Sequence, residues 1–273
     1  MSPDHPVFSG PTRLADIVFP GDANHHGTLF GGTGLAHMDK VAFIAASRHG
    51  HVDFVTASCE CIDFVTASCE CIDFNAPAKI GDIVELVGSV VRVGRKSLSV
   101  EVDMIAEGPL SGERHHCSRG VFNMVATGSH LKVRGGTLPP LPDAVTCIKD
   151  PDTHPAMVEI VFPEKTSHYG SLYGGNALAA MGKAAFIAAS RHCRKTVVMA
   201  GSTRVDFTSH IQSGEVVITV PRVIATGRSS MRVEVQLWAE NLHADERRKC
   251  GAGEFIMVAI DEDHRPLSFN GVV

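Results

Sequence analysis

Residues 18–49 read VFPGDANHHGTLFGGTGLAHMDKVAFIAASRH, and residues 161–192 read VFPEKTSHYGSLYGGNALAAMGKAAFIAASRH. The two stretches align without a gap at an offset of 143 residues, and 20 of their 32 positions are identical. Each is a loop rich in glycine that leads into an alanine-rich segment. Two copies of a unit this long indicate two homologous domains rather than a solenoid.

The correspondence continues along the chain at an offset of 133, where Gly81 matches Gly214 and Cys117 matches Cys250. The offset is thus ten residues smaller than before. Ten residues is the length of the block DFVTASCECI, which occurs twice in succession between Asp53 and Ile72. We interpret the second copy as a local insertion in the first domain. We expect a first domain over 8–131, a linker rich in glycine and proline over 132–154, and a second domain over 155–266.

The composition is that of a soluble globular protein, with 44% hydrophobic and 20% charged residues among 273. The net charge of −5 gives no sign of a general nucleic-acid or membrane-surface binder. The N-terminal stretch has no secretory apolar region, and no apolar run is long enough to span a bilayer. We therefore expect a cytoplasmic protein that binds neither nucleic acid nor membranes.

Eight cysteines, four of them in the duplicated block, do not predict a disulfide framework without an export signal. The spacing of Cys59 and Cys61 could indicate zinc, but zinc ligands usually come as Cys-x-x-Cys. We favour small hydrophobic side chains on one face of a strand, and expect no metal.

The apolar segments after the loops predict helices over 33–49 and 176–192, with Thr33 and Asn176 as N-cap residues. A helix that is apolar on most faces must be buried. Four to five β-rich runs follow; in the second repeat they cover 197–207, 215–225, 230–239 and 251–260. This order predicts an α+β fold in which the sheet wraps the helix.

Asp39 falls on an otherwise apolar side of the first helix, together with Leu35, Ala42, Phe43 and Ala46. A carboxylate among apolar side chains is costly unless it has a partner or a function. Gly31 and Gly32 come just before this helix, where free amide groups can hold an oxyanion. The alternatives are that Asp39 is only a structural acid and that Gly31 and Gly32 only form a tight turn.

Other polar residues of the loops and turns are candidates as well. Asn24 could orient a water or a carbonyl, or could cap an Asx turn, and His25 could assist or be structural. Cations and hydroxyls follow a glycine between two strands in both repeats and would suit phosphate groups, unless they form a solvated turn. They are Arg95, Lys96 and Ser97 in the first repeat and Arg228, Ser229 and Ser230 in the second.

The loop DANHHGTLFGG at residues 22–32, followed by Leu35 and by Met38-Asp39-Lys40, resembles the tandem hotdog-fold acyl-CoA thioesterases of the ACOT type. The resemblance covers about residues 12–130 and 155–265. It implies two hotdog domains, each a long helix wrapped by a curved antiparallel sheet, paired edge to edge as a double hotdog. It also implies acyl-CoA as substrate in the clefts between units, hydrolysis to CoA and a free acid, no cofactor, and a homo-oligomer of double hotdogs.

The resemblance carries the roles of a loop amide and a helix acid over to Asn24 and Asp39. The second repeat has Ser167 and Gly182 at these positions. If a site combines the loop of one unit with the helix of its neighbour, each cleft within the chain lacks one group, and the cleft of Ser167 with Asp39 keeps the base. Alternatively, Asn24 and Asp39 meet through local geometry or oligomer contacts.

The mechanism we expect uses Asp39 as a general base on water or as a nucleophile. The amides of Gly31 and Gly32, or of Gly174 and Gly175, would stabilise the oxyanion. Arg95, Lys96 and Arg228 would anchor the CoA phosphates. The alternatives are a hotdog enoyl-CoA hydratase or dehydratase that uses His25, and a non-catalytic acyl-CoA-binding or nucleotide-binding module.

The duplicated block yields a first prediction. Ten residues is an even number, so an inserted copy keeps the two faces of a strand in phase. We expect a deletion of Asp63–Ile72 to leave a cooperative thermal unfolding transition by circular dichroism. Loss of that transition would show that the copy is an integral part of the first domain.

Overall fold

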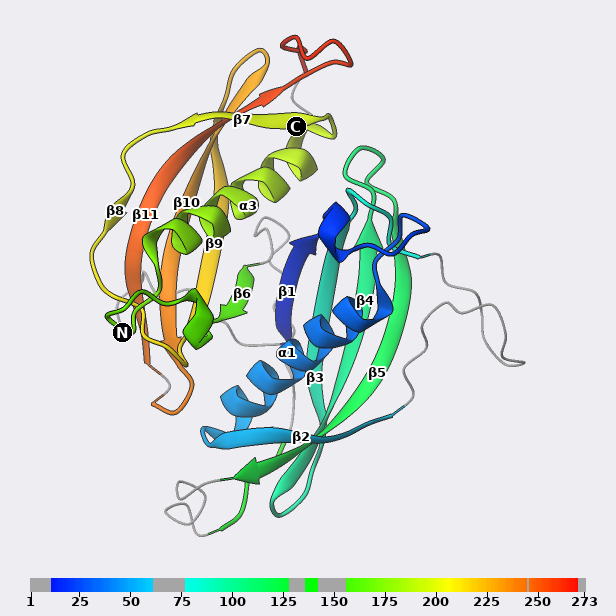
Figure 1. Cartoon of the computed structure of the whole chain (residues 1–273), viewed down its shortest axis with the longest axis vertical. Helices are drawn as coiled ribbons and strands as arrows, with labels where there is room; N and C mark the ends of the chain where they lie inside the picture. The colour runs from blue at the N-terminus through cyan, green and yellow to red at the C-terminus, as the bar shows by residue number, and fades with distance from the viewer. Residues whose placement is uncertain (1–10, 61–76, 128–135, 142–155, 245, 270–273) are drawn as a thin grey trace.

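A computed structural model describes residues 11–60, 77–127, 136–141, 156–244 and 246–269. The second copy of the ten-residue block, Asp63–Ile72, and most of the expected linker lie outside these residues. The chain forms two domains of the same architecture, each with one long helix against one sheet (Figure 1).

The first domain contains the helix α1, which runs over Gly31–Gly50, and a five-stranded antiparallel sheet of order β1-β3-β4-β5-β2. Its strands are β1 Thr12–Ile17, β2 Asp53–Glu60, β3 Ile83–Val93, β4 Ser97–Glu107 and β5 Arg114–Thr127. A short 3-10 turn, Pro20–Asp22, lies between β1 and α1. Strands β1 and β2, which flank the helix in sequence, therefore form the two opposite edges of the sheet.

The second domain repeats this order with α3 Gly174–Cys193 and a sheet of order β6-β9-β10-β11-β7, beside which β8 pairs with β11. Its strands are β6 Met157–Ile160, β7 Val197–Ser202, β8 Asp206–Phe207, β9 Val216–Thr226, β10 Ser230–Asn241 and β11 Glu246–Ala259. Phe54 pairs with Ala126 as Val197 pairs with Ala259. The strand registers are thus equivalent, and the α+β prediction of two hotdog domains is confirmed.

The helix starts differ from the prediction. Both helices begin at the glycine pair, with Phe30 and Tyr173 as N-cap residues that make no side-chain cap, so Thr33 and Asn176 lie within the first turn. Glycine is unfavourable inside a helix, which is why the sequence suggested a later start. The first strand of each domain, β1 and β6, was not predicted, because each is short and precedes the repeated loop.

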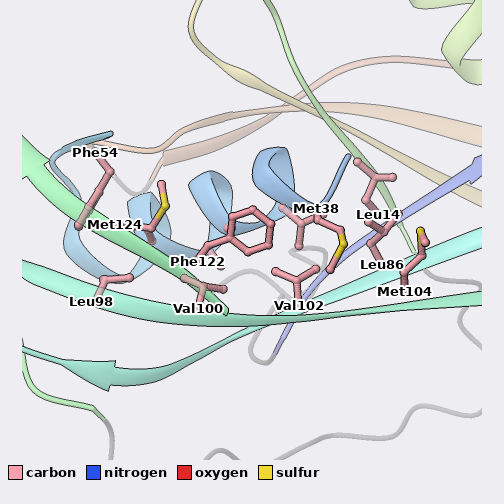
Figure 2. Close-up of a cluster of buried hydrophobic side chains, with 14 of the residues drawn as sticks. Leu14, Met38, Phe54, Leu86, Leu98, Val100, Val102, Met104, Phe122 and Met124 are labelled. Carbon is pink, nitrogen blue, oxygen red and sulfur yellow. The ribbon is translucent and has the colours of Figure 1, made fainter. Parts of the chain in front are cut away.

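The core of each domain lies between its helix and the concave face of its sheet. Alternate residues of β4 are buried, as expected for a sheet with one covered face. Figure 2 shows Met38 of α1 in one apolar layer with Val100, Val102 and Phe122 of the sheet. Leu138, in the expected linker, also packs in this core, and its amide donates to the Arg95 carbonyl at 3.0 Å. Leu138 of the expected linker therefore contributes to the core of the first domain.

The two domains meet through β1, β6 and one side of each helix (Figure 1). Among the described residues, no strand pairing joins the two sheets. Lys40, Ile44 and Arg48 recur every four residues on the side of α1 that faces domain 2. Lys183, Ile187 and Arg191 do the same on α3 toward domain 1.

Two equivalent arginine–glutamate clusters are buried at this interface. Arg48 of α1 lies 2.6 Å from the Glu240 carboxylate, and Arg191 of α3 lies 2.7 Å from Glu107. Burial alone would raise the pKa of Glu240, but the hydrogen bond and charge of Arg48 and the charge of Arg247 outweigh it and lower that pKa. Each cluster therefore ties a helix of one domain to a strand of the other.

We expect Arg48→Met to lower the free energy of unfolding in urea by about 3 kcal/mol at pH 7, since it leaves a buried charge short of a partner. The Glu240 side chain is only 2% exposed. Because its folded-state pKa is lowered, the stabilisation is present above the ordinary pKa of about 4.3 and is lost as the pH falls. The difference in the free energy of unfolding between the variant and the wild type should therefore become smaller at acidic pH.

The matched control is Arg222→Met, which removes a cation that is 72% exposed and 3.3 Å from Glu234. This change should cost less than about 1 kcal/mol. Equal effects of the two substitutions would contradict a special contribution of the interface pair.

Candidate functional site

Asp39 lies on the side of α1 that faces β2, away from domain 2. The Thr56 hydroxyl of β2 donates a hydrogen bond to Asp39 Oδ1 at 2.5 Å. Successive residues of a helix point about 100° apart, and the next residue, Lys40, is on the side that faces Glu159 of domain 2. Because β2 is the sheet edge opposite β1, the carboxylate is separated from the domain interface by the width of the helix.

The surroundings of this carboxylate come from β2 and β5. Thr56 also contacts the Met124 sulfur at 3.5 Å. Cys59 is exposed on the same strand, and partial burial, followed by the charge of Asp39, raises the pKa of its thiol. Cys59 is therefore protonated near neutral pH and adds no charge beside Asp39.

Sequence reasoning missed Thr56. The strand pairing shows that Thr56 and Met199 are equivalent, since they pair with Met124 and Met257 of the two equivalent strands. A polar residue that is replaced by methionine, next to an acid that is replaced by glycine, is the signal that could have identified it.

The same place in domain 2 is apolar. A Cβ on Gly182, the equivalent of Asp39, would lie 2.9 Å from the Met199 methyl group. Met199 thus occupies the space that the Asp39 side chain takes in domain 1. Only domain 1 presents a carboxylate and a hydroxyl at this position.

The helix starts present free amide groups in both domains. The amide of Gly34 donates to the Phe30 carbonyl at 3.0 Å, so the amides of Gly31 and Gly32 point out of the helix end. An added Cβ on Gly32 would lie 2.7 Å from the Phe30 ring, so a side chain at this position would displace the ring. Gly175 and Tyr173 repeat this contact, also at 2.7 Å.

The Gly31 amide and the Asp39 carboxylate of one domain are too far apart to act on one carbonyl. Asp39 follows Gly31 by eight residues, which at 1.5 Å per residue is about 12 Å along the helix. An oxyanion donor must come within about 3 Å of the reacting oxygen. The structure therefore does not combine these two predicted groups within one domain.

The loop residues stabilise their own turn. The Asn24 side-chain carbonyl accepts from the amides of His26 at 2.9 Å and Thr28 at 3.3 Å, and its Nδ2 donates to Thr28 Oγ1 at 3.0 Å. This is the Asx turn that the sequence left as an alternative. Within the described residues, the second hydrogen of the Asn24 Nδ2 group has no hydrogen-bond acceptor.

In domain 2, Ser167 Oγ accepts from the Tyr169 amide at 3.3 Å, so the serine forms the equivalent turn. His25 is exposed, and its ring stacks on His26 with 3.8 Å between centroids. Neither Ser167 nor His25 has a hydrogen bond to Asp39 among the described residues.

The basic turns lie at the tips of the β3–β4 and β9–β10 hairpins, at opposite ends of the molecule (Figure 1). Arg95, Lys96 and Ser97 are exposed, and the Arg95 carbonyl accepts from Leu138, which packs beside Gly50 at the C-terminal end of α1. The turn with Arg228, Ser229 and Ser230 has the equivalent place in domain 2, where the Phe269 amide donates to Arg228 at 3.1 Å. The turns are therefore far from the glycine pair of their own domain.

Within the described ranges, no three histidine, cysteine or acidic side chains are grouped so that they could hold a metal ion. Also within these ranges, no helix is both long and apolar enough to cross a membrane.

Comparison with known proteins gives consistent matches. The thioesterase superfamily model matches residues 26–113 and 169–244. A crystal structure of an acyl-CoA hydrolase from Agrobacterium tumefaciens is 50% identical, covers 95% of this chain and 98% of its own, and superposes with a TM-score of 0.83.

Two sequence relatives carry related names. A protein of Zymomonas mobilis, described as an uncharacterized acyl-CoA thioester hydrolase, is 34% identical over 42% of this chain and 78% of its own. The cytosolic acyl coenzyme A thioester hydrolase of Mus musculus is 21% identical over 97% of this chain and 78% of its own.

Proposed function

The chain belongs to the thioesterase superfamily, and from this premise we propose that it hydrolyses acyl-CoA thioesters to CoA and a carboxylic acid. The observation that carries the proposal is the Asp39 carboxylate, held by the Thr56 hydroxyl at 2.5 Å on the open side of the helix. It is a general base or nucleophile in a fixed orientation, and no metal or cofactor enters the reaction as proposed.

The reaction needs few groups. Asp39 removes a proton from water as the water oxygen adds to the thioester carbonyl, and the carbonyl electrons move onto oxygen. The C–S bond then breaks, the sulfur leaves as the CoA thiolate, and the proton held by Asp39 passes to it. The Thr56 hydroxyl keeps one carboxylate oxygen bonded, so that the other faces the water.

The oxyanion donors for this step come from another copy of the chain in our proposal. The amides of Gly31 and Gly32 are about 12 Å from Asp39 along their own helix, and domain 2 lies on the other side of that helix. Among the described residues β2 pairs only with β5, so its outer edge is unpaired beside Asp39, and Val55 on this strand is 50% exposed. A second copy against this edge would bring a loop and a helix start to the carboxylate.

The repeat asymmetry favours one way of pairing. Asn24 and Asp39 are both in domain 1, whereas domain 2 has Ser167 and Gly182. A twofold contact between domain 1 of two copies supplies both groups to each of two sites, and a contact of domain 1 with domain 2 supplies neither site with both. We therefore propose a homo-oligomer in which β2 edges meet.

The cations of the two hairpin turns can bind CoA phosphates at a site only in such an assembly. Arg95, Lys96 and Arg228 lie far from the glycine pair of their own domain, so any CoA phosphate they bind belongs to a site that another copy completes. We also propose a cytoplasmic location, which the name of the mouse relative supports.

We expect Asp39→Asn to lower kcat/KM about 100- to 10,000-fold, the usual contribution of a general base. Thr56→Val should lower it about 10- to 100-fold, since a hydrogen bond to a charged group contributes about 1.5–3 kcal/mol. The measurement is thiol release over a panel of acyl-CoAs from short to long chains.

Asp206→Asn is the matched control, because it removes an exposed carboxylate outside β2, 2.6 Å from Arg204, and should leave kcat/KM unchanged. Full activity of Asp39→Asn on every substrate would remove Asp39 from the chemistry. Water addition to an enoyl-CoA without thiol release would indicate a hydratase, and CoA binding without any turnover a binding module.

The pairing of copies has its own test. Asn24→Ala and Asp39→Asn should each be nearly inactive, and a refolded equal mixture should recover about a quarter of wild-type activity, because half of the pairs then hold one intact site. Light scattering would give the size of the assembly. A mixture as inactive as its parts, from a protein that measures as a monomer, would contradict a site shared between copies.

A further inference from the structure

A pocket of about 180 Å³ lies between the two domains, on the side of α3 that faces domain 1. Its walls come from β1, β6, β9 and the N-terminal half of α3. Asp39 and Thr56 do not line it, and Gly182 points to the other side of α3. The pocket is therefore separate from the proposed catalytic carboxylate.

The pocket carries more ammonium groups than carboxylates. Lys183 pairs with Asp16 at 2.7 Å, whereas Lys165 and Lys40 share the single carboxylate of Glu159, with Lys40 at 3.8 Å. The Lys40 side chain is only 19% exposed. Three cations against two anions leave one positive charge that is poorly solvated, and such a charge favours the binding of an anion.

A residue difference between the two repeats explains why the interdomain pocket is present on the α3 side. Ala180 lines the pocket, and the equivalent residue of domain 1 is His37. Burial lowers the pKa of the His37 imidazole. The charges of Asp16, Lys40, Asp22 and Lys183 also act on it, so it lies beside the ionic cluster of the pocket, although Asp22 does not line the pocket itself. The imidazole takes up space on its side of the interface that the Ala180 methyl group leaves open.

The charge of the wall differs between the repeats as well. Lys165 stands where domain 1 has Asp22. Domain 2 thus has the smaller side chain of Ala180 and the additional cation of Lys165 in the wall of one pocket, which makes the pocket positively charged.

The volume and lining restrict the ligand. An engineered apolar cavity of about 150 Å³ binds benzene, whereas sites for drug-sized ligands and cofactors measure about 300–1,000 Å³. At about 180 Å³ the pocket is too small for CoA or a nucleotide. Its apolar wall includes Leu14, Met157 and Leu172. A small molecule with an aliphatic tail and one negative charge matches both properties.

We propose that this interdomain pocket binds a short aliphatic monocarboxylate of about four to six carbons. The tail contacts Leu14, Met157 and Leu172, and the carboxylate binds Lys40 and its neighbouring lysines. Under the proposed function this ligand belongs to the class of the acid product, so the pocket is a second product-binding site. Both domains contribute to it, and the bound acid therefore stabilises their contact.

The test is isothermal titration calorimetry of the full chain with sodium butyrate and sodium hexanoate, against sodium chloride at equal ionic strength. We expect saturable binding of both acids, weaker binding of acetate, and little binding of butyramide, which lacks the charge. Lys40→Met should weaken butyrate binding at least tenfold, because it removes the surplus cation and keeps the other two pairs. Lys195→Met, an exposed lysine outside the pocket, should bind as wild type.

Ala180→His is the second variant, and it copies the residue that domain 1 has at this position. It should abolish butyrate binding by filling the pocket. Equal affinities of wild type, Lys40→Met and Ala180→His would place the acid elsewhere and overturn the proposal. So would a wild-type protein that binds no acid at about 50 mM.

The readout needs no acyl-CoA, so it is independent of hydrolysis. Asp39→Asn should bind butyrate with wild-type affinity. Loss of binding in Asp39→Asn with retention in Lys40→Met would mean that the acid binds at the catalytic carboxylate, which also overturns the proposal.

Discussion

The angular separation of Asp39 and Lys40 on α1 is the constraint on which the rest of the molecule depends. One helix step of about 100° places Lys40 toward Glu159 of domain 2 and Asp39 toward Thr56 of β2. One side of the helix thereby joins the domains, and the other side holds the carboxylate that we propose as catalytic. This carboxylate lies outside the contact between the repeats of one chain, so under the proposed mechanism the groups that complete its site come from outside that contact.

The two repeats have diverged on both sides of their helices while keeping the same core. On the β2 side, Asp39 and Thr56 correspond to Gly182 and Met199, so a polar site in domain 1 has an apolar equivalent in domain 2. On the interface side, His37 corresponds to Ala180, which opens a pocket. Core positions such as Met38 and Met181 are unchanged, because the helix must fill the same concave sheet.

The interface is held by charge as much as by apolar contact. Arg48 with Glu240 and Arg191 with Glu107 are equivalent, and each links a helix to a strand of the other domain. Breaking such a buried pair leaves an uncompensated charge, so the relative position of the domains is tightly specified. The fixed position of the domains keeps the lysines of the interdomain pocket close together and leaves β2 at the edge of the first sheet, where we propose that a further copy binds.

Four features could be read from the residues alone: the tandem repeat, the α+β fold of each unit, the resemblance to acyl-CoA thioesterases, and the absence of the acid from the second repeat. These features are local or repeated, so spacing and residue type suffice to reveal them. The contacts of the site needed the folded chain, because Thr56 binds Asp39 from another element and Arg48 pairs with Glu240 across the domain interface. The fold also shows that Asn24 caps its own turn and that the glycine pair lies a long way from the acid. Helix periodicity gives the angles between side chains but not the neighbour on each side, and partners such as Arg48 and Glu240 are 192 residues apart in the chain.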